Sequence, residues 1–234
     1  MRGSLVPMKR SLACLFALAS LLIPTAAHAA DLETMLAKPG AIGTEQLPEV
    51  LKLLGFSPVP TSLASGGVEV TSANFDADPD NERLVVVTTE AVSNNTLTIG
   101  RYAALLDGGK VVFRDKLSES GPADRFEGSA EVRAQPVHDD KVMDIVLSLS
   151  IAVRRGVGPT TVLRNEQRIV TFQRGKPEVI LRHANTATGP WGEVKGKQIV
   201  VKGKSVRLVE LPESTTLSVY LFDPASFSFK PQGG

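Results

Sequence analysis

Oxygen-bearing side chains recur at every second position between residues 74 and 82, directly before an apolar, β-branched run. They are Asn74, Asp76, Asp78, Asp80 and Glu82, and the run that follows is Leu84-Val85-Val86-Val87. Carboxylates at this density repel one another unless water or a shared cation lies between them. Ca²⁺ suits such a set, because it takes about six to eight oxygen ligands in a flexible geometry. The segment predicts a calcium loop before a strand, with an ion-free, solvent-facing turn as the alternative.

This acidic loop and the strand after it resemble the calcium loops of FG-GAP and VCBS-type repeats, which build integrin-like β-propellers in exported bacterial proteins. The resemblance is strong over residues 74–87 and weaker around residues 136–153. It implies one calcium ion and a set of ligands along the loop. The implied ligands are the side chains of Asn74, Asp76, Asp78 and Glu82 and the backbone carbonyl of Asp80.

The loop departs from the family pattern at its turn. The family has glycine at the sixth loop position, where this chain has Pro79, whose ring fixes φ at about −65°. A register shifted by two residues puts Asn81 at the turn, which asparagine tolerates, but leaves Leu84 at the ninth ligand position. The first three ligands in that register are Asp76, Asp78 and Asp80. Each register therefore has one flaw.

Most catalytic constellations are absent from the chain. Beyond Ala30 the histidines are His138 and His183, and no His-x-x-x-His pair, Cys/His cluster or Gly-x-Ser-x-Gly elbow occurs. The chain therefore lacks the residue patterns that zinc-dependent and serine hydrolases use. Both histidines are expected on the surface or in a strand. The polar segment His138-Asp139-Asp140-Lys141 is expected to be a turn without an ion.

The segment Met1 to Ala30 has the pattern of a secretory signal peptide. A basic start precedes an apolar stretch over residues 11–23, and Ala27-His28-Ala29 offers a small-x-small cleavage site. That stretch is too short for a membrane span, which needs about 20 residues. We expect the segment 1–30 to direct export, so that the protein is periplasmic or secreted. Translation starts at Met1 or at Met8.

Removal of the signal changes the charge and the cysteine content. The segment 1–30 holds three of the 26 basic side chains and none of the 25 acidic ones, so the remainder has 23 basic, 25 acidic and a net charge of −2. That balance argues against nucleic acid or an anionic membrane as a partner. The single cysteine, Cys14, leaves with the signal, so no disulfide is expected. About 204 residues remain, enough for one domain with its own core.

Hydrophobic patterning divides the rest of the chain in two. Residues 31–67 predict a short helical segment, centred on residues 45–55, and a linker. Residues 68–234 predict strands separated by Gly-containing turns, with no alternation of strands and helices. The expected strands are Arg83–Val92, Thr96–Leu106, Lys110–Arg114, Val142–Val153, Thr160–Leu163, Arg168–Phe172, Glu178–Arg182, Gln198–Lys202, Ser205–Leu211 and Thr215–Phe222. The fold class is therefore all-β with antiparallel sheets and a short N-terminal helical segment.

A weak internal period suggests how those strands are grouped. The dipeptides Glu69-Val70, Glu131-Val132 and Glu193-Val194 recur at equal spacing, and a polar loop and an apolar strand follow each of the first two. Repeats of about 62 residues fit four-stranded, blade-like units. We expect a partial propeller of such blades, or a β-sandwich.

The sequence favours an exported, non-catalytic β-domain of the cell envelope, with a binding or structural role and an unknown protein or glycan as partner. One alternative is an envelope hydrolase that uses carboxylates alone, such as Asp139 or Asp144 beside Asp76 or Glu82. The other is an accessory subunit of an envelope complex, whose sheet edge completes a partner's sheet.

Overall fold

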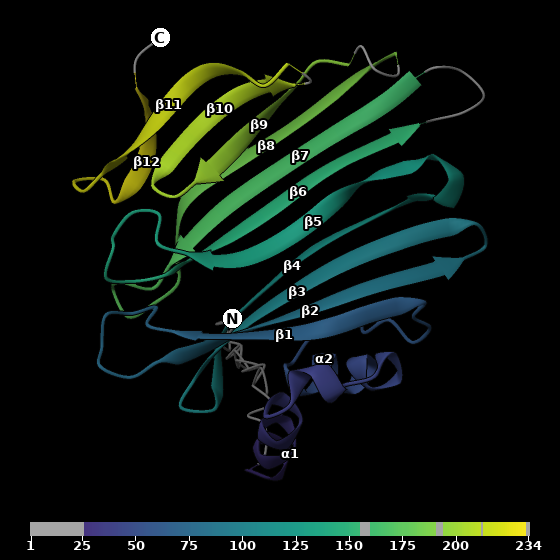
Figure 1. Ribbon diagram of the computed structural model, residues 1–234, viewed down its shortest axis with the longest axis vertical. Helices are drawn as coiled ribbons and strands as arrows, with labels where there is room; N and C mark the ends of the chain where they lie inside the picture. Colours follow the sequence, from purple (N-terminus) through teal and green to yellow (C-terminus); the bar gives the residue numbers. More distant parts are fainter. Residues whose placement is uncertain (1–25, 155–159, 191–193, 212, 233–234) are drawn as a thin grey trace, which may run out of the picture.

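The protein contains three four-stranded antiparallel sheets that follow one another along the chain (Figure 1). The computed structural model describes residues 26–154, 160–190, 194–211 and 213–232. Sheet A consists of β1 (Ser65–Ala73), β2 (Glu82–Ser93), β3 (Thr96–Asp107) and β4 (Lys110–Pro122). Sheet B consists of β5 (Phe126–Gln135), β6 (Asp144–Arg154), β7 (Thr160–Thr171) and β8 (Glu178–Pro190). Sheet C consists of β9 (Gly196–Lys202), β10 (Ser205–Leu211), β11 (Thr215–Asp223) and β12 (Ser228–Gln232). The all-β, antiparallel fold class is confirmed.

Two short helices precede the sheets and cover the outer face of sheet A. They are α1 (Ala26–Leu36) and α2 (Leu47–Leu53), with 3₁₀ turns at Pro39–Ala41 (η1) and Thr44–Gln46 (η2) between them. Pro48 occupies the first turn of α2, where its missing N–H is not needed, and Gly55 follows the helix at φ 79°. The predicted signal peptide lies mostly in residues 1–25, outside the described residues. No helix in the described ranges is long and apolar enough to cross a membrane.

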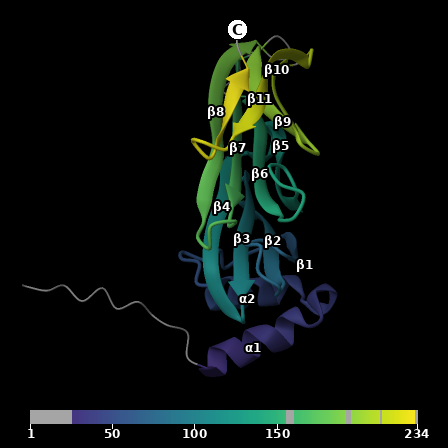
Figure 2. The same ribbon diagram turned by 90° about the vertical axis from the view of Figure 1, so that its left-hand side faces the viewer.

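The molecule is a stack of four layers, helices, sheet A, sheet B and sheet C (Figures 1 and 2). The helices pack on one face of sheet A, where Leu51 and Leu54 meet side chains such as Val85 and Val87. The other face of sheet A packs on sheet B, in a core that includes Leu84, Val86, Leu105, Leu147, Leu149 and Ile151. The second face of sheet B packs on sheet C, in a core that includes Val146, Ile169, Ile199, Val201, Val206 and Phe229.

The strands that differ from the prediction are edge strands or polar extensions. β1, β5 and β12 are not among the predicted strands, and β4 and β8 continue well beyond the predicted Arg114 and Arg182. These segments lie at sheet edges, where a strand needs no continuous apolar pattern because fewer of its side chains are buried. The strands predicted at Thr160–Leu163 and Arg168–Phe172 are one continuous strand, β7. Polar residues at its centre interrupt the apolar pattern but not the strand.

The first two strands of sheet A and the first two strands of sheet B pair in the same register, and equivalent residues are separated by the predicted period. Val70 of β1 pairs with Val85 of β2, and Val132 of β5 pairs with Leu147 of β6. The loop 74–81 separates β1 from β2, and the loop 136–143 occupies the same place in sheet B. In sheet C the two-residue turn Gly203-Lys204 joins β9 to β10, so no polar loop separates them. Glu193, in the third dipeptide of the predicted period, lies outside the described residues.

Candidate cation site

The loop over residues 74–81, here called the acidic loop, is held against the junction of sheets A and B. Phe75 is completely buried in the core between these sheets. Its backbone N–H donates to Glu82 Oε2 at 2.6 Å, and the backbone carbonyl of Asn74 accepts a hydrogen bond from the N–H of Met143 at 2.8 Å. The apolar ring and these two hydrogen bonds fix both the loop and the first residue of β2.

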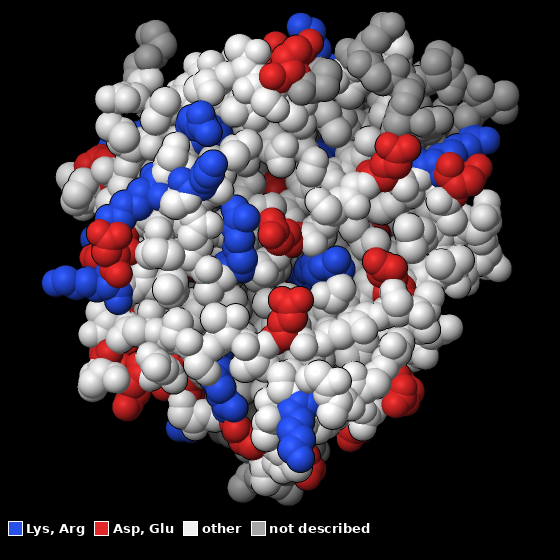
Figure 3. Space-filling model, in the orientation of Figure 1, with Lys and Arg blue, Asp and Glu red and all other residues white. Residues whose placement is uncertain are grey.

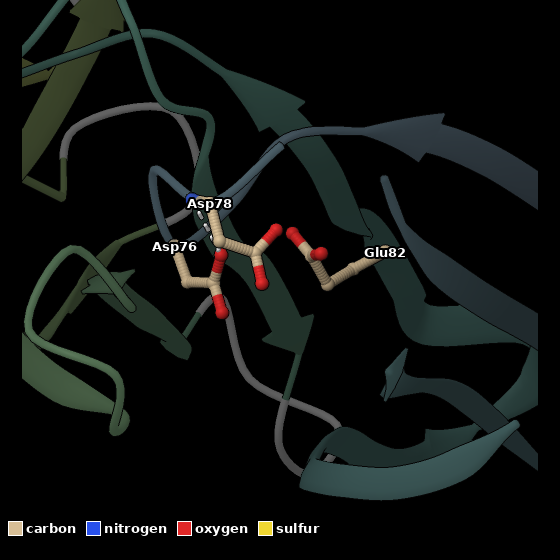
Figure 4. A group of neighbouring side chains, drawn as sticks. All are labelled: Asp76, Asp78 and Glu82. Carbon is tan, nitrogen blue, oxygen red and sulfur yellow. Dashed lines mark hydrogen bonds between the residues drawn. The ribbon is translucent and has the colours of Figure 1, made fainter. Parts of the chain in front are cut away.

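Three of the predicted ligands lie together. Carboxylate oxygens of Asp76, Asp78 and Glu82 lie within 4.8 Å of one another. Figure 4 shows the carboxylates of Asp78 and Glu82 facing each other, with that of Asp76 beside them. The loop backbone imposes this arrangement, because the N–H of Asp78 donates to Asp76 Oδ1 at 3.1 Å and the N–H of Asp80 donates to Asp78 Oδ1 at 2.8 Å. Successive Asx turns thus gather the acids on one side of the loop.

Glu82 is the buried member of the group. Its residue is 2% exposed, and Oε1 has no hydrogen-bond partner among the described residues. Burial raises the pKa of Glu82, the Phe75 N–H opposes that rise, and the charges of Asp76 and Asp78 add to it. A carboxyl pKa raised by folding means that the ion-free fold loses stability as the pH rises from the unfolded pKa through the folded one. A cation between the three carboxylates would remove that penalty.

Asn74 and Asp80 have other positions. The side chain of Asn74 braces the loop, because Oδ1 accepts the N–H of Ala77 at 2.7 Å and Nδ2 donates to the carbonyl of Asp78. Asp80 is exposed, and its carboxylate is not part of the group of three. The left-handed residue of the loop is Ala77, at φ 70°, rather than Pro79 or Asn81. The structure therefore brings together the side-chain ligands that the first register placed at its third, fifth and ninth positions.

The left-handed backbone of Ala77 leads to a stability prediction. Ala77→Gly is expected to raise the free energy of unfolding by about 1 kcal/mol, since an L-residue in this region carries a steric penalty of about 1–2 kcal/mol and glycine carries none. Urea denaturation measures the change. The matched control is Ala73→Gly, in extended β1, which should lower stability by about 0.5–1 kcal/mol. A destabilised Ala77→Gly protein would contradict this backbone conformation.

The equivalent position in sheet B holds a buried ion pair. At the spacing that relates sheet A to sheet B, Phe75, Asp76 and Glu82 correspond to Val137, His138 and Asp144. Asp144 Oδ2 accepts the N–H groups of Val137 at 3.0 Å and His138 at 3.1 Å, as Glu82 accepts that of Phe75. His138 Nδ1 lies 2.8 Å from Asp144 Oδ1, and the two side chains are 2% and 0% exposed.

The prediction that His138 is a surface or strand residue is therefore wrong. Burial alone would lower the pKa of His138, but the hydrogen bond and charge of Asp144, with contributions from Gln173 and Asp139, outweigh it and raise the pKa. When the ring is protonated, it neutralises the buried carboxylate of sheet B. His138 and Asp76 occupy equivalent positions of the predicted repeat. That equivalence is the sequence signal from which the role of His138 could have been inferred.

The acidic loop borders a pocket between sheets A and B. Asp76 and Glu82 line it together with Asp107 at the end of β3, Phe172 after β7 and Lys176 in the β7–β8 turn. Its other walls are Leu105, Val112, Gly175 and Pro177. The three-carboxylate group is therefore open to solvent on one side and closed by the core on the other.

The acids proposed for carboxylate-only hydrolysis have separate surroundings. Asp144 contacts the imidazole of His138, and Asp139 Oδ2 accepts a hydrogen bond from Gln173 Nε2 at 2.9 Å. Within the described ranges, neither joins the cluster of Asp76 and Glu82. On the face seen in Figure 3, basic and acidic side chains are interspersed rather than gathered by sign.

Comparison of the chain with protein-family models, with curated proteins and with solved structures finds no match. The resemblance of the acidic loop to FG-GAP and VCBS-type repeats therefore stays a prediction.

Proposed function

We propose that the protein is an exported, non-catalytic β-domain of the bacterial cell envelope, with a binding or structural role, and that its acidic loop binds one calcium ion. The observation that supports a bound ion concerns the buried Glu82. Its Oε1 lacks a hydrogen-bond partner among the described residues, and its carboxylate lies beside two others. A buried carboxylate oxygen that lacks a hydrogen-bond partner or a counter-charge is strongly unfavourable. A hard cation satisfies three carboxylate oxygens at once.

The second loop supports the charge of the proposed ligand. Where sheet B has the same carboxylate position, Asp144, the chain supplies its own cation through His138. At the matching position sheet A has Asp76 in place of a basic side chain, and Lys176 of the adjoining pocket lies 3.5 Å from Glu178, so an external cation is the proposed source of the neutralising charge. The oxygen-only ligand set favours Ca²⁺ over transition metals, which prefer nitrogen or sulfur. Solvent completes the coordination on the side that opens to the pocket.

The role proposed for the ion is to fasten the acidic loop at the junction of sheets A and B. Extracellular calcium modules have a Kd of about 10⁻⁴ to 10⁻³ M. At ten times Kd, calcium would stabilise the fold by about 1.4 kcal/mol. For a chain of this size that corresponds to a rise in Tm of about 3–6 °C. We propose that the surface held in place by the ion binds a protein or glycan of the envelope.

Thermal unfolding in EDTA and in millimolar CaCl₂ tests the site. We expect calcium to raise the Tm of the wild type by about 3–6 °C. Glu82→Gln should abolish the shift, and in EDTA it should be at least as stable as the wild type because it carries no buried charge. Asp80→Asn is the matched control and should keep the shift, since its carboxylate lies outside the group of three. If calcium does not change the Tm of the wild type, the acidic loop is an ion-free turn and the proposal is wrong.

A further inference from the structure

The two faces of sheet B differ in chemistry. The face toward sheet A carries an unbroken aliphatic row on β6, namely Ile145, Leu147, Leu149 and Ile151. The face toward sheet C carries polar side chains in the middle of β6 and β7, where Ser150 Oγ donates to Asn165 Oδ1 at 2.8 Å and Gln167 Nε2 donates to Ser148 Oγ at 2.6 Å. Within the described ranges, Asn165 Nδ2 is buried without a hydrogen-bond partner. The interface between sheets B and C therefore combines an apolar core with buried polar side chains, whereas the facing strand of the interface between sheets A and B is aliphatic throughout.

His138 connects the two sides of that interface. Its ring nitrogens face sheet B, with Nδ1 on Asp144 and Nε2 2.8 Å from Gln173 Oε1. The same ring packs on sheet C, with its centroid 5.0 Å from that of Phe222 and 5.9 Å from that of Phe227. A single imidazole thus joins the buried carboxylate of one sheet to the aromatic cluster of the next.

We propose that His138 is a proton-dependent clasp, which fastens sheet C to sheet B when the imidazole is charged and loosens it when the imidazole is neutral. A neutral ring supplies no counter-charge to the fully buried carboxylate of Asp144, and a buried charge without its partner is strongly destabilising. The polar side chains in the middle of this face of sheet B, Ser148, Ser150, Asn165 and Gln167, are uncharged and supply no other counter-charge. The layer that opens is sheet C, because the ring packs on Phe222 and Phe227.

The charged groups around the clasp do not supply a substitute cation. Asp144 faces the ring from β6, and Asp139 of the same loop reaches it through Gln173. Of the cations in the surrounding elements, Lys141 of the same loop is exposed and acts on Asp139, Arg174 lies over the Phe227 ring at 3.5 Å, Lys204 pairs with Asp140 and Lys230 pairs with Asp223.

The sign of the pH effect follows from the environment of the ring. Burial lowers the pKa of His138, but Asp144, Gln173 and Asp139 together raise it above its usual value. A histidine with a raised folded pKa contributes its full stability below the unfolded pKa of about 6.5 and loses it as the pH rises through the folded pKa. Sheet C should therefore loosen in alkaline solution and stay fastened in mildly acidic solution.

Hydrogen exchange of the purified protein at pH 6.0 and pH 8.5, corrected for the intrinsic exchange rates, tests the clasp. We expect the protection factors of amides in β9–β11 to fall by up to about tenfold for each pH unit between the unfolded and folded pKa of His138. Amides of β2 and β3 in sheet A should keep their protection at both pH values. Equal protection of sheet C at the two pH values would overturn the proposal.

Two variants separate His138 from other titrating groups. His138→Gln can still form hydrogen bonds but carries no charge, so sheet C should be weakly protected at both pH values. His183→Gln, which removes the half-buried histidine of β8, should behave as the wild type. If His138→Gln does not fold, the His183→Gln protein decides the question: the midpoint of the loss of protection must coincide with the NMR titration midpoint of the His138 ring. A different midpoint overturns the proposal.

Discussion

Asp144→Ala is expected to lower the free energy of unfolding by about 3–5 kcal/mol at pH 6, the range measured when one partner of a buried ion pair is removed. Asp144 is fully buried and accepts the N–H groups of Val137 and His138 as well as the imidazole of His138. The substitution leaves the two N–H groups without their acceptor and the ring without its counter-charge. Urea denaturation followed by far-UV circular dichroism measures the loss.

The control for this prediction is another aspartate in the same loop. Asp140 is 76% exposed at its side chain, and its ion pair with Lys204 lies at the surface. Asp140→Ala should therefore change stability by about 0–1 kcal/mol. Similar losses of unfolding free energy in Asp144→Ala and Asp140→Ala would show that the buried pair of His138 and Asp144 stabilises the fold no more than a surface ion pair does.

The β character of the chain is predictable because it rests on local patterning. The predicted strand Ser205–Leu211 has the bounds of β10, since an apolar run is framed there by two turn signals. Asn94 and Asn95, both with positive φ, form the turn between β2 and β3 that their residue types favour. β5 escapes prediction because Gly128 and its exposed polar neighbours show no run of β-branched residues. Its place is decided by pairing with β6, which is a property of the tertiary structure.

The candidate site is predictable only in part, for a related reason. The spacing of acids identifies Asp76, Asp78 and Glu82, but it cannot show that Glu82 alone is buried, because burial depends on how sheets A and B meet. Nor can it separate a ligand from a residue that braces the loop, which is the observed role of the Asn74 side chain. Both Asn and Asp make such local hydrogen bonds.

Phe75→Ala is expected to lower the free energy of unfolding by about 3–5 kcal/mol, the usual range for emptying a buried aromatic site. Phe75 has no exposed surface and packs in the core shared by sheets A and B. Urea denaturation again measures the loss, with Val92→Ala as the control because Val92 is 53% exposed. Phe75→Leu should lose less, since it keeps much of the buried volume.

The same variant separates packing from ion binding in the acidic loop. Phe75→Ala removes the ring but keeps the backbone N–H that donates to Glu82 Oε2. If that hydrogen bond is what orients the carboxylate, the calcium-dependent rise in Tm should persist in Phe75→Ala, although both Tm values are lower. Loss of the rise in a variant that still folds would mean that the ring itself holds the three carboxylates in place. In either case, comparison with Glu82→Gln assigns the calcium response to the carboxylate and the basal stability to the core.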